Sequence, residues 1–311
     1  MLQTLITKEQ VFGELPEIIT QPVYKQQEIC QNSTGEYFNP KFALYNLYSE
    51  DENGIPIKIG GQVTRDYPLT QHPKFFGDVE DILLENIDHN LVAGHDAVTT
   101  YTKVSHNGAF AQREYIFNNL KTKIDNPKFE TELAYRVIVW HGLGGIASNN
   151  FRAGAIDFFC SNGMISGEFN AVTMKNTKNF ELGKFVAELQ NATINFNAQV
   201  EKYQRELNTE ITIKKAQQFI EKITKHDFSK DAERKRQTKA LAHNLLEQIG
   251  AEFKTRGNNI FAVRSALTDW STHGDTRKTN IDHVAKTRLE REQKVTQWTN
   301  SQAFEELSLV A

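Results

Sequence analysis

The feature that most constrains the fold is a change of hydrophobic periodicity near residue 180. Before it, short runs rich in β-branched and aromatic residues are separated by Gly- and Asn-containing turns, as in antiparallel strands. After it, apolar residues recur every three or four positions, which indicates amphipathic helices. Strands followed by helices predict an α+β fold. We expect an arm at residues 1–36, a mixed α+β core at 37–180 and a helical region at 181–311.

Local patterns refine the strand-rich half. Asn53-Gly54 between two apolar runs predicts a hairpin, and Pro56 places its second strand at a sheet edge. We further expect a helix at 77–90, a hairpin with strands at 98–104 and 115–124, strands at 133–140 and 155–160, and a continuation of the sheet at 164–172.

Helical spacing dominates the second half. We expect a long helix from Phe185 to Tyr203, with Gly250 and Gly257 interrupting later helices. These later helices are expected at 211–225, 231–249 and 259–270, with a last one beginning near Thr279.

The net charge of −3 is unevenly distributed. Residues 1–90 carry 14 acidic and 6 basic groups, a net of −8, whereas residues 211–240 carry 9 basic and 4 acidic groups, a net of +5. A basic segment permits contact with nucleic acid, and a solvated helix face is the alternative reading.

Residues 98–123 interleave basic and aromatic side chains on predicted strands. Cations neutralise phosphates and rings stack on unpaired bases, so this pattern suits single-stranded nucleic acid. An ordinary amphipathic sheet would give the same pattern. The candidate contacts, on the sheet and on the helical side, are Tyr101, Lys103, Arg113, Tyr115, Lys121, Lys123, Lys235 and Arg236.

Patterns that would indicate an enzyme are weak. Residues 142–147 match the G-x-G-x-x-A dinucleotide fingerprint, but too little chain follows for its helix, so we expect a turn. Cys160 and His141 could form a nucleophile and base, although a lone Cys ending an apolar strand is more often a packing residue. We therefore predict no catalytic residues, no cofactor and no metal site.

Two cysteines are too few for a disulfide framework, and no apolar run approaches the roughly 18 residues of a membrane span. The first residues lack the basic and apolar regions of a secretory signal. We expect a cytoplasmic protein that makes no membrane contact.

Three segments resemble a known family. They are the strand with Arg113-Glu114-Tyr115, the stretch 141–167 in which an apolar strand ends in Cys160-Ser161-Asn162-Gly163, and the stretch 266–273. On these segments the chain resembles the YafZ/YfjQ-like family of phage- and plasmid-related proteins, whose function is unknown. That family usually has Asn-Ser-His-Asp-Gly where this chain has residues 140–144, so a functional Asp there would be missing.

The resemblance implies a mobile-element protein that acts on DNA or beside the replication and recombination machinery. The order of elements also resembles ring-forming single-strand annealing proteins, an analogy of layout alone. We therefore expect a non-enzymatic, oligomeric protein that binds single-stranded DNA and could promote annealing or recombination. The alternatives are a module that binds a host or phage protein, and an enzyme built around His141 and Cys160.

Overall fold

The structure is a computed structural model of the chain. It describes residues 8–27, 29–31, 33–38, 44–94, 96–146, 148–157, 172–174, 183–229, 236–273 and 284–308.

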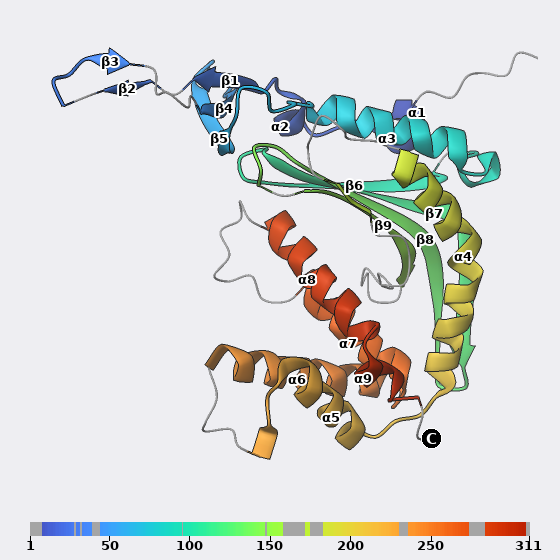
Figure 1. The fold of residues 1–311 in the computed structure, drawn as a ribbon. Coiled ribbons are helices and arrows are strands. Elements are labelled where there is room, and N and C mark those ends of the chain that lie inside the picture. The colour runs from blue at the N-terminus through green and yellow to red at the C-terminus, as the bar shows by residue number, and fades with distance from the viewer. Residues whose placement is uncertain are drawn as a thin grey trace, which may run out of the picture.

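A curved, five-stranded antiparallel sheet, the main sheet, organises the molecule (Figure 1). Its strand order is β10-β9-β8-β7-β6. The strands are β6 (Val98–Ser105), β7 (Phe110–Asn126), β8 (Phe129–Gly142), β9 (Asn149–Asp157) and β10 (Val172–Met174). Helices α3 (His72–Asn86) and α4 (Gly183–Asn208) cover its outer face, and α8 (Val284–Thr299) lies on its hollow inner face.

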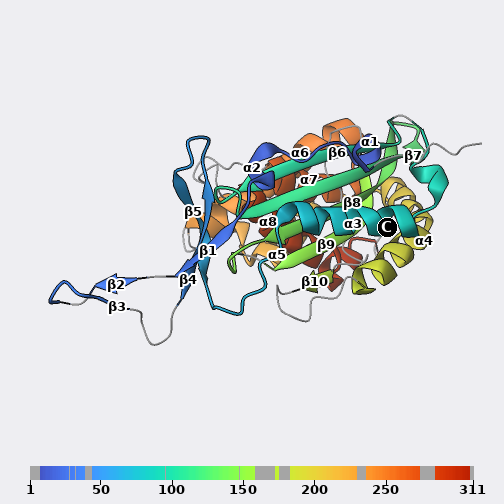
Figure 2. The ribbon, with the colours of Figure 1, turned by 90° about the horizontal axis from the view of Figure 1, so that it is seen from above.

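The N-terminal part adds two small sheets. Strands β1 (Tyr24–Gln27), β4 (Tyr45–Glu50) and β5 (Pro56–Val63) form one, in the order β1-β4-β5. The hairpin of β2 (Cys30–Gln31) and β3 (Tyr37–Phe38) projects from the body in both views (Figures 1 and 2). Three short helices, α1 (Lys8–Phe12), α2 (Glu17–Thr20) and η1 (His89–Leu91), complete this part.

The C-terminal helices form a second hydrophobic core of their own. They are α5 (Ile213–Thr224), α6 (Arg236–Arg256), α7 (Ile260–His273) and α9 (Gln302–Glu305), together with the end of α8. Helix α5 begins at a Thr212 cap whose hydroxyl accepts from the backbone N–H of Lys215, as an N-cap residue does.

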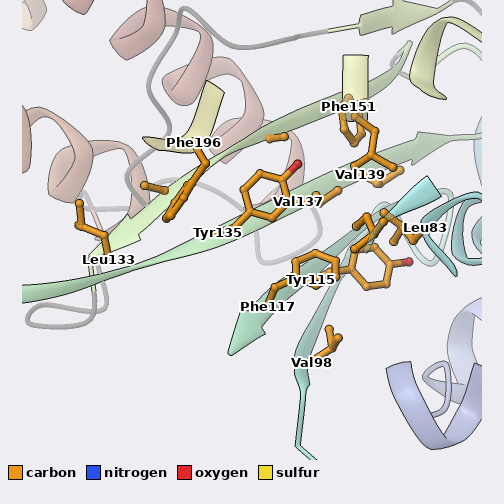
Figure 3. Close-up of a cluster of buried hydrophobic side chains, with 14 of the residues drawn as sticks. Leu83, Val98, Tyr115, Phe117, Leu133, Tyr135, Val137, Val139, Phe151 and Phe196 are labelled. Carbon is orange, nitrogen blue, oxygen red and sulfur yellow. The ribbon is translucent and has the colours of Figure 1, made fainter. Parts of the chain in front are cut away.

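The largest core fills the space between the outer face of the main sheet and helices α3 and α4 (Figure 3). Tyr115, Tyr135 and Val137 project to this side, because alternate residues of a strand share a face. Val79 and Leu83 of helix α3 pack in the same core, and they lie one turn apart on the buried face of the helix.

The predicted α+β class is confirmed, with antiparallel sheets before a helical second half. The first hairpin is confirmed at its turn, where Gly54 takes a φ of +74°, and Pro56 opens the edge strand β5. Other boundaries differ. Helix α3 begins five residues early, at His72, because Pro73 occupies the first turn, where a missing N–H costs nothing.

Two further expectations need correction. Gly250 does not interrupt a helix, because α6 runs through it to Arg256, and Gly257 with a φ of +84° ends it. The described residues of the segment predicted as an arm do not all project from the body: Phe12 and Ile19 are buried in the main core, whereas the later β2–β3 hairpin projects. The strand expected at 164–171 lies outside the described residues.

Arg113 fixes the N-terminal segment to the main sheet. All five of its guanidinium N–H groups have acceptors on three elements: Glu80 Oε1 (2.9 Å), Thr102 Oγ1 (3.0 Å) and the carbonyls of Phe12, Gly13 and Glu14 (2.6 to 3.2 Å). These carbonyls lie at the C-terminal end of the short helix α1, where carbonyl groups lack partners within the helix, and that of Phe12 also accepts from Thr100 Oγ1 at 2.7 Å. We call this arrangement the Arg113 clamp.

We expect Arg113→Met to lower the free energy of unfolding by about 3–5 kcal/mol, because it leaves the buried Glu80 carboxylate without its partner. Urea unfolding of the purified protein measures this. Adding Glu80→Gln to Arg113→Met should recover part of the loss, since the second change removes the stranded charge. An unchanged unfolding midpoint in Arg113→Met would show that the clamp does not stabilise the fold.

Candidate functional site

The inner face of the main sheet carries polar side chains where it is most deeply buried. Directly paired residues of antiparallel strands project from the same face. By this register Gln112, Glu114, Arg136 and Arg152 all project from the inner face, toward α8. Each of them is at most 5% exposed. Uncovered strands would leave such residues in water, so their burial depends on the helix that crosses them.

Helix α8 closes this face and adds charges of its own. Leu289 packs against Phe110, Ile138 and Trp140 of the sheet. On the same side of α8, Arg288 and Glu292 are 7% and 2% exposed. The six polar residues from four elements are called the inner-face cluster: Gln112, Glu114, Arg136, Arg152, Arg288 and Glu292.

Two contacts fix the arginines of the sheet. Arg136 Nη1 donates to Glu114 Oε1 at 2.6 Å, which joins β8 to β7. Arg152 Nη1 donates to Thr296 Oγ1 at 2.8 Å, which joins β9 to α8, and its guanidinium lies 5.9 Å from the Trp140 ring centroid. The cluster therefore connects three central strands with the helix.

Burial perturbs the carboxyl group of Glu292 on α8. Its Oε1 lies 3.5 Å from Arg288 Nε. Burial raises the pKa of Glu292, although Arg288, Arg136 and Arg152 each act to lower it. Burial also lowers the pKa of the Arg152 guanidinium. Burial thus favours the protonated form of Glu292, and the attraction of the arginines favours its charged form. Because burial is the larger effect, Glu292 can hold a proton.

Several buried polar atoms of this site have no hydrogen-bond partner in the part of the chain that the structure describes. They are both amide atoms of Gln112, Arg136 Nη2, Trp140 Nε1, Arg152 Nε, Arg288 Nε and Nη1, and both carboxylate oxygens of Glu292. Buried polar groups normally find partners, and a group of orphans at one place indicates water or a ligand. The arrangement is chemically suited to hold a small polar molecule.

The predicted nucleic-acid contacts divide between the two faces. Tyr101 and Lys103 pair with Glu114 and Gln112, so they lie on the inner face, and both are exposed on the outermost strand β6. Tyr101 is 55% exposed. Both can reach a ligand in solvent.

Lys121 and Lys123 share that face farther along β7. Each lies near a cross-strand carboxylate: Lys121 Nζ is 3.6 Å from Glu132 Oε2, and Lys123 Nζ is 2.5 Å from Glu130 Oε2. Their charges are partly neutralised, so they attract phosphate less than free lysines would.

Arg113 and Tyr115 are not positioned for a ligand. They lie on the outer face, at 1% and 0% exposure. Arg113 uses every donor in the clamp, and the Tyr115 hydroxyl donates to Glu80 Oε1 at 3.1 Å. Both residues therefore act within the fold, and the predicted contact with nucleic acid would require unfolding of the core.

The helical candidates are only partly described. Arg236 is the first residue of α6, and Lys235 lies outside the described residues, as does the side chain of Arg236. In the neighbouring α5, Lys222 Nζ lies 2.5 Å from Glu306 Oε2, so one cation of the basic segment is paired with an acid.

His141 forms a pair with another buried histidine. His72 Nε2 lies 2.7 Å from the carbonyl of Gly108, so this nitrogen carries the proton. Neutral His72 then accepts at Nδ1 from His141 Nδ1, 2.8 Å away, and His141 Nε2 remains an acceptor. Phe75 stacks on the His141 ring at 4.1 Å.

This geometry does not present a catalytic base to solvent. His141 is fully buried, and burial lowers its pKa well below the ordinary value. Cys160, its predicted partner, lies outside the described residues. The enzyme alternative therefore lacks an accessible base at His141.

The glycine-rich turn serves packing. Gly144 and Gly145 have φ values of 62° and 71°, and β9 begins at Asn149 where a dinucleotide site would need a helix. The backbone N–H of Gly61 donates to the Gly144 carbonyl at 3.2 Å. A side chain at Gly144 would meet Gly61 N at 2.9 Å, so the close approach requires glycine.

Sequence reasoning missed the inner-face cluster. The available signal was a single charge within an apolar strand, as at Arg136 in Leu133–Val139 and at Arg152 in Asn150–Ala155. Such residues are rarely buried without a partner. The pattern does not reveal the partner, because α8 lies more than a hundred residues later in the chain.

No group of three or more His, Cys, Asp or Glu side chains among the described residues is placed to hold a metal ion. None of the helices that these residues form combines the length and apolar character needed to cross a membrane.

Comparison with known proteins yields one match. A family model described as a domain of unknown function (DUF932) matches residues 87–302, more than half of the chain. The matched range contains the main sheet and every residue of the inner-face cluster. No curated protein matches the chain, and no solved structure does. The expectation of a family of unknown function is confirmed.

The histidine pair predicts a loss of stability in mild acid. Burial lowers the pKa of His72 from 6.5 to about 4, so its contribution is present above pH 6.5 and is lost as the pH falls toward 4. Between about pH 7.5 and pH 4.5, His72 alone should cost roughly 2–3 kcal/mol. Urea unfolding at both pH values measures this. The His72→Gln/His141→Gln variant should lose less stability on acidification, and an equal loss would assign the effect to other groups.

Proposed function

We propose that this chain, which belongs to the DUF932 family, binds single-stranded DNA along one edge of its main sheet. In this proposal the protein is non-enzymatic, works as an oligomer and could promote annealing. The finer assignment to YafZ/YfjQ-like proteins of phages and plasmids is part of the same proposal.

The observation that carries the proposal is a track of aromatic and basic groups on one face and one edge. Among the described residues, strand β6 forms one edge of the main sheet and ends where Val98 pairs with Phe117. Beyond that pair, the C-terminal part of β7 forms the edge. The track consists of Lys103, Tyr101, Lys121 and Lys123. In register it extends over eight residues of β8, which is roughly 27 Å at the rise of a strand.

The chemistry of this edge suits a single strand better than a duplex. The Tyr101 ring is available for stacking on an unpaired base, and the neighbouring Lys103 can neutralise a phosphate. A duplex hides its base faces, so Tyr101 would gain nothing from it. Lys121 and Lys123 should contribute less, because Glu132 and Glu130 compete with phosphate for them.

Fluorescence anisotropy of a labelled single-stranded oligonucleotide tests the proposal. We expect binding that weakens steeply as salt rises and that exceeds binding to a matched duplex. The Tyr101→Ala/Lys103→Glu variant should bind at least about tenfold more weakly, because it loses one stacking contact and one phosphate contact.

Lys74→Glu is the matched control. It makes the same charge change at an exposed site of α3, over the outer face of the sheet. Its affinity should remain within about twofold of wild type at moderate salt, where distant charges are screened. Absence of binding at low salt, or equal weakening by both variants, would contradict the edge as the binding site.

A second candidate function, binding of a protein partner, is favoured by the projecting β2–β3 hairpin. Tyr37 is 74% exposed and Ile29, just before β2, is 62% exposed, on a segment that stands away from the body. Exposed apolar side chains on an extended arm are typical of a surface that another protein covers. The acidic charge of residues 1–90 would suit a basic partner.

The Ile29→Ser/Tyr37→Ser variant tests this candidate in a pull-down from the host lysate. A specific partner should be retained by the wild type and by Tyr101→Ala/Lys103→Glu, and lost by the hairpin variant. Equal recovery with all three proteins would exclude the hairpin as the docking surface.

A further inference from the structure

The inner-face cluster differs from the Arg113 clamp in how its donors are used. Every N–H of Arg113 has an acceptor. Arg136, Arg152 and Arg288 are also buried, at 1%, 5% and 7% exposure, yet each has at least one N–H without an acceptor in the described chain. Leaving buried donors unpaired costs free energy. Because the fold satisfies every donor of Arg113 but not those of the three other arginines, we infer that a partner of these arginines is missing.

The unsatisfied atoms define the chemistry of that partner. Donors predominate: they come from three arginines, the Trp140 indole and the Gln112 amide. The acceptors are the carboxylate of Glu292 and the amide oxygen of Gln112. Three arginines face two glutamates, so the cluster has an excess of one positive charge when both acids are ionised. A suitable ligand is an anion that also carries a hydrogen-bond donor.

We propose that the inner-face cluster binds a protonated phosphate group, as hydrogen phosphate or as a phosphomonoester. The unpaired arginine donors belong to β8, β9 and α8, and a tetrahedral anion can accept from donors on several sides, whereas a carboxylate offers two oxygens in one plane. The P–O–H group donates to Glu292. This site is independent of the proposed nucleic-acid edge, since neither Tyr101 nor Lys103 belongs to it.

Glu292 gives the site a selectivity that depends on pH. One proton must lie between its carboxylate and the ligand oxygen, since two bare anions would repel. Burial raises the pKa of Glu292, and the charged groups around it are Arg288 on α8, Arg136 and Arg152 on the sheet, and Glu114 on β7. At lower pH Glu292 can supply the proton itself. At higher pH the ligand must supply it, which phosphate can do and sulfate cannot.

Isothermal titration with inorganic phosphate and with sulfate, at matched ionic strength, tests the proposal at about pH 6 and pH 8. We expect sulfate to bind at least about tenfold more weakly than phosphate at pH 8, because it has no proton to donate to the Glu292 carboxylate. At pH 6 the difference should shrink. Sulfate also serves as the control for nonspecific salt stabilisation.

Two variants separate the site from an adventitious anion. Glu292→Gln keeps the shape of the side chain and can donate to either anion, so it should abolish the preference for phosphate at both pH values. Gln112→Leu should weaken phosphate binding several-fold without changing the preference. A preference that persists in Glu292→Gln, equal affinities of the wild type for both anions at pH 8, or no binding of either anion would each overturn the proposal.

The source of the phosphate is distinguished by a third ligand, a nucleoside 5′-monophosphate. Its second pKa is near 6, so about half of the molecules carry this proton at pH 6 and almost none carry it at pH 8. Tighter binding than inorganic phosphate at pH 6, with a steep loss at pH 8, would assign the site to a phosphomonoester. Binding of inorganic phosphate alone at both pH values would assign it to the free ion. Equal binding of an unphosphorylated dinucleotide, whose diester has no such proton, would refute a protonated phosphate.

Discussion

The central strands β7 and β8 are covered on both faces, and this double burial governs the rest of the structure. Over Phe110–Phe117 and Leu133–Gly142 side chains of both faces are buried, so every charge within these two stretches has been removed from water. An unpaired buried charge costs several kcal/mol. On the outer face the fold meets that demand fully, because the guanidinium of Arg113 is enclosed by acceptors. On the inner face it meets the demand only in part, at Arg136 and Arg152.

Buried ion pairs also attach the helical region to the sheet. Arg256 at the end of α6 lies 2.7 Å from Asp157 of β9, and Arg264 of α7 lies 2.6 Å from Glu206 of α4. Such pairs add little net stability, but they tolerate few alternative geometries because a displaced charge would remain buried and alone. They therefore fix where α6 and α7 lie against the sheet and α4. Helix α8 packs on α7 through the rings of Trp298 and Trp270, whose centroids are 5.3 Å apart at an interplanar angle of 35°, so its position over the inner face follows from these contacts.

The sequence predicted the hairpins and helices that local residues specify. It did not predict which side chains are buried where that depends on segments distant in the chain. Asn53-Gly54 specifies its hairpin by itself, and the spacing from Phe185 to Tyr203 specifies α4. By contrast, Lys103 and Arg113 look alike in sequence, each a cation on a strand with aromatic neighbours. Period-two alternation assigns them to opposite faces but cannot tell which is covered. The answer depends on Glu80, Phe12 and α8, none of which is local. Gly250 was misread because packing on both sides outweighs its poor helix propensity.

The inner-face cluster shows why the position of α8 and the occupation of the site should be thermodynamically linked. Leu289 of α8 packs on Phe110 and Trp140, and this apolar contact favours docking of the helix. Arg288 and Glu292 of α8 are buried on the same side of the helix. A ligand that satisfies Arg152 of the sheet and Arg288 of the helix together contacts both elements only when they are docked. It must then bind the docked state more tightly than any other, and it stabilises that state by the same free energy. A polar contact between α8 and the sheet therefore makes the packing of this helix depend on the binding of a small anion.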